Sequence, residues 1–185
     1  MQEIDALTFC KFTVGLIFTL SSLSKIKSFS QYTKTVSIFR LVPEFFVTWT
    51  AKSILTLEIF VVISLFVNQV IAFWLASILL LIFSIALALA IVRNIKTSCN
   101  CFGTRDRPIS VLDILRNFGF LCCSCGGGWL AATESEIAIA SPSLSSGVSG
   151  LVALGFVLIW IHLSEIYHLF SDIKKINRTQ KLFHL

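Results

Sequence analysis

Two cysteines separated by one residue stand in a short polar loop of an otherwise apolar chain, in the sequence Cys99-Asn100-Cys101-Phe102-Gly103. A thiol attacks another sulfur only as a thiolate, and nearby cations favour the thiolate. Four cations flank this loop: Arg93, Lys96, Arg105 and Arg107. A disulfide between cysteines so close in sequence closes a small strained ring, and strain makes a disulfide more oxidising. The pattern predicts a redox-active dithiol at Cys99 and Cys101.

Two other interpretations of this pair stay open. The cysteines could be two unpaired loop residues, or they could form half of a zinc site. Structural zinc usually takes four Cys or His ligands with CxxC-like spacing. No further Cys or His lies near residues 99–101 in the sequence, so no metal is expected.

A second group of cysteines lies about twelve to fifteen residues into a later apolar segment. Cys122 and Cys125 are three residues apart, so they share a helix face and have the CxxC spacing of many redox pairs. Cys123 lies between them, and Cys10 of the first apolar segment is expected at a similar depth. The alternative is that these buried cysteines act as small apolar side chains.

Ionisable residues within membrane segments are costly and tend to be functional or paired. Glu58 is the clearest case, and we expect it to pair with Lys25, Arg93 or Arg116. It is either a structural charge pair or a group that handles protons during thiol exchange. Arg116 is also placed to stabilise a thiolate of the dithiol.

A last candidate site lies near the C-terminus. His162 and Glu165 are three residues apart in an apolar segment, so they share a helix face. They either bind the headgroup of a membrane quinone and exchange protons with it, or they are ordinary interfacial residues.

The elements that position these residues are membrane helices. Hydrophobic residues make up 56% of the 185-residue chain and charged residues only 14%, against roughly 25% in average soluble domains. A spanning helix needs about 20 mostly apolar residues. The sequence therefore predicts an all-α, polytopic transmembrane bundle with a four-helix core, five spans and one interfacial amphipathic helix. The spans are expected at residues 6–24, 49–67, 70–92, 110–132 and 148–170, and the amphipathic helix at 25–46, closed by Pro43.

The distribution of positive charge predicts the orientation of these spans. The net charge is +5, and fourteen of the fifteen Lys and Arg residues, all but Lys11, fall on one side in a five-span arrangement. The positive-inside rule then puts the N-terminus outside and the C-terminus inside the inner (cytoplasmic) membrane, with Cys99 and Cys101 near the cytoplasmic face. No basic stripe interleaved with aromatics indicates nucleic-acid binding.

The order of these features resembles a known family. Lys25 follows the first span, Glu58 lies in the second, Arg93 closes the third, and Cys-x-Cys-Phe-Gly and Arg116-Asn117 follow. Over roughly residues 5–130 this is similar to the MauE family, within the wider DoxX-like group of redox-associated membrane proteins. Asn100 stands where the family usually has Gly, and Asn tolerates a left-handed backbone better than most residues.

The resemblance implies a link to disulfide formation in exported proteins and to thioredoxin-like partners. It divides the chain into a MauE/DoxX-like four-helix membrane domain at residues 1–132 and a second part at residues 133–185. The second part holds a Ser-rich loop, the fifth helix and a basic tail.

Together these features predict a membrane thiol–disulfide oxidoreductase that exchanges disulfides with a thioredoxin-like or exported partner. A membrane quinone is the candidate terminal electron carrier, as in quinone-coupled disulfide generators. The two cysteine groups are expected roughly 20 Å apart at ~1.5 Å per helical residue, so exchange between them needs a shuttle or an inward-folding loop. The rival hypothesis is a non-catalytic membrane assembly factor or chaperone for a redox enzyme. The direction of electron flow is open.

Overall fold

The described part of the protein is entirely helical. A computed structural model describes residues 2–67, 69–93, 95, 111–133 and 144–162. The helices are α1 (Gln2–Lys27), α2 (Phe29–Ile38), α3 (Glu44–Val67), α4 (Gln69–Val92), α5 (Val111–Thr133) and α6 (Leu144–Ile161). The predicted all-α membrane bundle is confirmed, and the expected spans agree with the observed helices to within a few residues over most of the chain.

Three of the described helices are long and apolar enough to cross a membrane: α1, α3 and α4. Helix α5 carries Asp113 and Arg116 in its first turns, which lowers its apolar character. The apolar stretch described in α6, Gly147–Ile161, is shorter than a full span. The prediction of five spans therefore has direct support for three helices and stays a prediction for α5 and α6.

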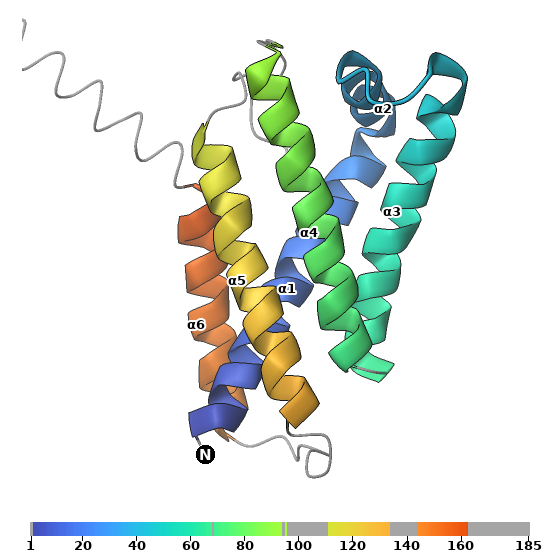
Figure 1. The fold of residues 1–185 in the computed structure, drawn as a ribbon. Coiled ribbons are helices and arrows are strands. Elements are labelled where there is room, and N and C mark those ends of the chain that lie inside the picture. The colour runs from blue at the N-terminus through green and yellow to red at the C-terminus, as the bar shows by residue number, and fades with distance from the viewer. Residues whose placement is uncertain (1, 68, 94, 96–110, 134–143, 163–185) are drawn as a thin grey trace, which may run out of the picture.

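The helices run side by side, with α1 crossing the bundle diagonally (Figure 1). Helix α1 packs against α3 on one side and against α5 and α6 on the other, while α4 packs mainly against α5 and also against α3. The short α2 lies at the end of the bundle where α1 ends, α3 begins, α4 ends and α5 begins (Figure 1). This end therefore gathers four helix termini.

Large apolar side chains cover the outside of the bundle as well as its core. Val14, Phe73 and Phe120 are completely buried, whereas Phe66 and Trp129 are 81% and 69% exposed. Lipid tails are as apolar as these side chains, so exposure to the bilayer carries no penalty. The outward aromatic and aliphatic residues are consistent with a surface solvated by lipid.

Glycines set the closest approaches between helices. A Cβ added at Gly127 of α5 would lie 2.6 Å from the Phe73 ring and 2.9 Å from Cβ of Cys10. A Cβ at Gly119 would lie 2.7 Å from the Trp160 ring of α6. Small residues let membrane helices pack this closely, so these two glycines bring α1, α4 and α6 against α5.

The amphipathic segment is shorter than its sequence pattern indicates. Helix α1 continues to Lys27, α2 ends at Ile38, and Arg40 takes a left-handed backbone with φ of 48°. Pro43 does not close the amphipathic helix; it stands immediately before α3, which starts at Glu44 rather than near Trp49. Proline is favoured at a helix start because its missing N–H would have no helical partner there.

Candidate functional site

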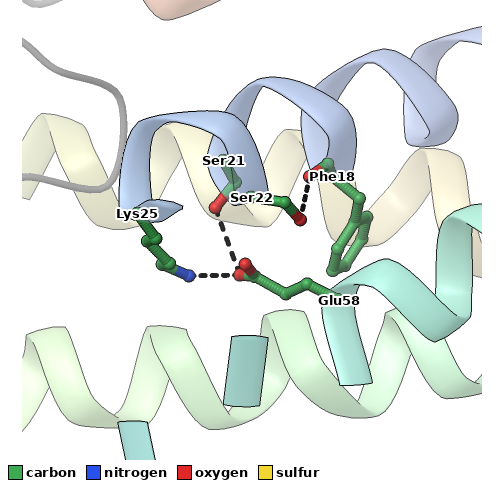
Figure 2. A network of polar contacts seen from close by, with 5 residues as sticks. All are labelled: Phe18, Ser21, Ser22, Lys25 and Glu58. Atoms are coloured by element: carbon green, nitrogen blue, oxygen red, sulfur yellow. Dashed lines mark hydrogen bonds and ion pairs between the residues drawn. The ribbon is translucent and has the colours of Figure 1, made fainter. Parts of the chain in front are cut away.

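The most deeply buried charges in the described residues belong to one ion pair between α1 and α3 (Figure 2). Glu58 of α3 is completely buried, and Lys25, in the last turn of α1, is 1% exposed. Lys25 Nζ donates to Glu58 Oε1, and Ser21 Oγ donates to the same oxygen at 3.1 Å. Lys25 is thus the partner of Glu58 among the three cations that the sequence offered.

The regular spacing of α1 places these groups together. Ser21 and Lys25 are four residues apart and share one face of α1. Ser22 points differently and donates to the Phe18 carbonyl at 2.7 Å (Figure 2). The ammonium of Lys25 also lies 5.0 Å from the centre of the Tyr32 ring and 4.7 Å from that of Phe83. A desolvated cation gains most from such ring faces, so three helices besides α1 hold the lysine in place.

Glu58 lines a small cavity, and one of its carboxylate oxygens is left over by the ion pair. Oε2 is buried and has no hydrogen-bond partner among the described residues. A cavity of about 60 Å³ lies between α1, α3, α4 and α5. Its polar lining consists of Ser21, Lys25, Glu58, Arg116 and Asn117. The arrangement is a polar pocket enclosed by apolar side chains.

Arg116 lies at this cavity but pairs within its own helix. Its Nη2 is 3.5 Å from Oδ1 of Asp113, one turn earlier in α5. Lys25, Glu58, Arg116 and Asp113 therefore supply two positive and two negative charges to this region. The local charge balance permits burial of Lys25, Glu58 and Arg116 beside the half-buried Asp113, because an uncompensated buried ion is expensive.

Arg93 occupies the end of α4 and does not approach Glu58. It is exposed, and its Nη1 donates to the carbonyl of Phe39 at 3.3 Å. Phe39 directly follows α2 and lines the cavity. Arg93 thus connects the end of α4 to a residue at the border of the polar pocket.

The cysteines described in α1 and α5 are free thiols. Cys122 and Cys125, predicted as a second pair, are both exposed, and the Cys125 thiol donates to Ser77 Oγ of α4 at 3.5 Å. Cys10 of α1 packs against Gly127 of α5, one helical turn beyond Cys123. The cysteine of the cluster nearest to Cys10 is Cys123. Cys122 is exposed, and the partly exposed Cys125 turns its thiol toward α4.

Several predicted site residues lie outside the described part of the chain: Cys99, Cys101, Phe102, Gly103 and Glu165. His162 is exposed and directly follows α6. The segment that holds the dithiol joins the end of α4 to the start of α5, and both of these ends lie at the α2 end of the bundle (Figure 1).

Sequence reasoning missed Ser21 and Phe39 as part of the polar pocket, and it treated Asn117 only as part of a motif. A signal existed for Ser21, which precedes Lys25 by one helical turn. For Asn117, the comparable signal is an asparagine beside an arginine within an apolar segment, and the structure shows both side chains buried. Phe39 had no such signal because only the packing of α2 brings it to the cavity.

Fold and site together define a helical membrane protein with a buried ion pair and a polar pocket near one end of its bundle. The family described as methylamine utilisation protein MauE matches residues 4–133. A relative from Paracoccus denitrificans, the methylamine utilization protein MauE, is 30% identical over 155 residues, which cover 82% of this chain and 80% of the relative. The chain belongs to the MauE family. No solved structure matches it significantly.

Proposed function

We propose that this chain is a membrane thiol–disulfide oxidoreductase of methylamine utilisation, with Cys99 and Cys101 as its exchanging dithiol. The observation that supports this most is the buried pair of Lys25 and Glu58 beside a polar cavity. Ionisable groups inside a membrane bundle are costly and usually serve a function. The cavity adjoins α4 and α5, the two helices that the dithiol segment connects.

The proposed reaction is an exchange of one disulfide for another. One thiolate of the Cys99–Cys101 dithiol attacks the disulfide of a thioredoxin-like or exported partner and forms a mixed disulfide. The second thiolate displaces the partner, which leaves with two thiols while Cys99 and Cys101 become a disulfide. Two electrons pass to the partner, and the two protons that the dithiol loses balance the two that the partner gains. The reverse direction uses the same steps.

The neighbouring charges have defined roles in this proposal. Arg93 and Arg116 stabilise the attacking thiolate, because nearby cations favour the charged form of a thiol. Glu58 takes up and returns the proton that each thiol exchanges. A membrane quinone, which accepts two electrons and two protons, is the proposed terminal carrier, with His162 and Glu165 as its proposed headgroup residues.

The second candidate function is a non-catalytic assembly factor for a redox enzyme. The observation that favours it is that the pair of Lys25 and Glu58 also joins α1 to α3, as a purely structural contact would. Cys122 and Cys125 are free cysteines, which is compatible with both functions.

Replacement of both loop cysteines distinguishes the two functions. The Cys99→Ser/Cys101→Ser variant should lose disulfide exchange with its partner, while each single variant should trap a mixed disulfide that non-reducing electrophoresis and mass spectrometry identify. Cys122→Ser is the matched control, because that thiol is exposed and lies away from the loop. An unchanged exchange rate in the double variant would leave the assembly factor as the function.

A further inference from the structure

The polar cavity beside Glu58 has a size that selects its occupant. Its volume is about 60 Å³. An apolar protein cavity that accommodates benzene measures about 150 Å³, whereas a water molecule occupies about 30 Å³ in the liquid. The space is therefore sufficient for about two water molecules.

The lining of the cavity also fits water. A buried water makes about three hydrogen bonds to polar groups. Oε2 of Glu58 is completely buried and lacks a hydrogen-bond partner among the described residues, while Asn117 and Ser21 line the same space. An asparagine side chain both donates and accepts. Water in this position would donate a hydrogen bond to Oε2, the carboxylate oxygen that the ion pair does not use.

We infer that the cavity binds a pair of water molecules that join Glu58 Oε2 to Asn117, and that Glu58 takes up and releases a proton through them. The proton adds to the carboxylate, forms the carboxylic acid and returns by the same route, so no other atom or electron is exchanged. The use of this proton in thiol exchange rests on the proposed function; the proton site itself does not.

The contact between Arg93 and Phe39 indicates where the water meets the solvent. Phe39 lines the cavity and lies at the α2 end of the bundle. Arg93, at the end of α4, donates a hydrogen bond to the carbonyl of Phe39. The residues of α4 that line the cavity, such as Leu80 and Phe83, are apolar. The route for the proton therefore passes beside Phe39.

The charges around Glu58 keep the proton uptake transient. Lys25 of α1 pairs with the carboxylate and lies over Tyr32 of α2; Arg116 of α5 lines the cavity and pairs with Asp113. The described lining residues of α4 carry no charge. Protonation of Glu58 removes the counter-charge of Lys25, and an unpaired buried ion is unfavourable. Release of the proton restores the ion pair with Lys25.

A hydrophobic carbodiimide tests this inference on the purified full-length protein in nanodiscs. The reagent adds only to a protonated carboxyl and leaves a stable N-acylurea that mass spectrometry locates. We expect an adduct on Glu58 whose yield increases as the buffer is changed from mildly alkaline to mildly acidic. Ala86→Leu, which fills the cavity from α4, should lose the adduct because the proton no longer reaches the carboxylate.

Three further variants make each outcome decisive. Ile85→Leu changes the exposed neighbouring position and should label like the wild type. Lys25→Met removes the counter-ion and should label across the whole pH range, which shows that the reagent reaches Glu58. Cys99→Ser/Cys101→Ser should label normally whether or not the proposed function holds. Absence of the adduct in the wild type while Lys25→Met labels, or full labelling of a folded Ala86→Leu variant, would overturn the inference.

Discussion

At the scale of single residues, Lys25 and Glu58 are compatible with the membrane interior only as a pair. Each is removed from solvent, and the carboxylate receives one hydrogen bond from Ser21 in addition to the ammonium. Desolvation of two ions costs several kcal/mol each, which their attraction offsets only in good geometry. The pair is therefore poor evidence for added stability and better evidence for a retained function.

The energetics of the pair can be tested with a double-mutant cycle. Lys25→Met should lower the free energy of unfolding by about 3–5 kcal/mol, because Glu58 loses its partner and must either be buried as an unpaired ion or take up a proton on folding. Lys25→Met/Glu58→Leu should recover that loss, because an apolar pair of similar volume needs no counter-charge. Denaturant titration in detergent micelles measures all members of the cycle. A single variant as stable as the double variant would show that the two charges do not depend on each other.

At the scale of helices, α5 packs against α4 and α1 and also meets Trp160 of α6. Its buried stripe includes Arg116, Asn117 and Phe120 near the polar cavity and Gly127 near Cys10. Trp160 of α6 donates to the carbonyl of Arg116 at 3.1 Å, and its ring covers Gly119. One helix thus carries the polar pocket together with the close contact to α6 at one end, and the close contact to α1 and α4 toward the other.

Two adjacent glycines in α5 test how much the close contacts matter. Gly127→Ala should lower stability by about 1–3 kcal/mol, the usual cost of overpacking, because its Cβ would overlap Phe73 and Cys10. Gly126→Ala is the matched control: it meets nothing within 4 Å and should leave stability unchanged or slightly higher. Thermal unfolding in the same detergent gives both values. Equal effects of the two substitutions would contradict the close approach of α1 to α5.

At the scale of the whole molecule, we propose that the end of the bundle near α2 is the functional end. It holds the termini of α1, α3, α4 and α5, the polar cavity and the two points between which the dithiol segment runs (Figure 1). The cations of the sequence are concentrated in the segments that connect helices at this end. We propose, from the positive-inside rule, that this end faces the cytoplasm.

Labelling of thiols in intact cells tests that orientation. In a variant with serine at Cys10, Cys122, Cys123 and Cys125, a membrane-impermeant maleimide should fail to label Cys99 and Cys101 until the cells are permeabilised. The expected reason is that the positive segments stay on the cytoplasmic side. A cysteine introduced in the Ser-rich segment at residues 141–146 is the control for the outer face. Labelling of Cys99 and Cys101 from outside would reverse the proposed topology.

Much of the architecture could be predicted from local patterns. Continuous apolar runs of about 20 residues indicate membrane helices because the bilayer requires every backbone group to be paired within the segment. The motif order from Lys25 to Asn117 was sufficient to indicate the family that residues 4–133 match. The predicted end of the amphipathic helix and the predicted start of the second span, on either side of Pro43, were wrong. A proline is compatible both with the end of one helix and with the start of the next, so the sequence pattern does not distinguish the two.

The sequence by itself determined that this chain is a helical membrane protein of the MauE family, with an ionisable Glu58 that needs a partner. Only the tertiary structure decided which of three cations that partner is, that Arg116 pairs with Asp113 instead, and that Phe39 borders the pocket. It also left Cys122 exposed, turned the thiol of Cys125 toward Ser77 of α4 and set Cys10 against Gly127. The physical reason is that hydrophobicity and helical spacing act along one helix, whereas the crossing of α1 over α3 and α5 is fixed by side-chain packing between residues far apart in the sequence.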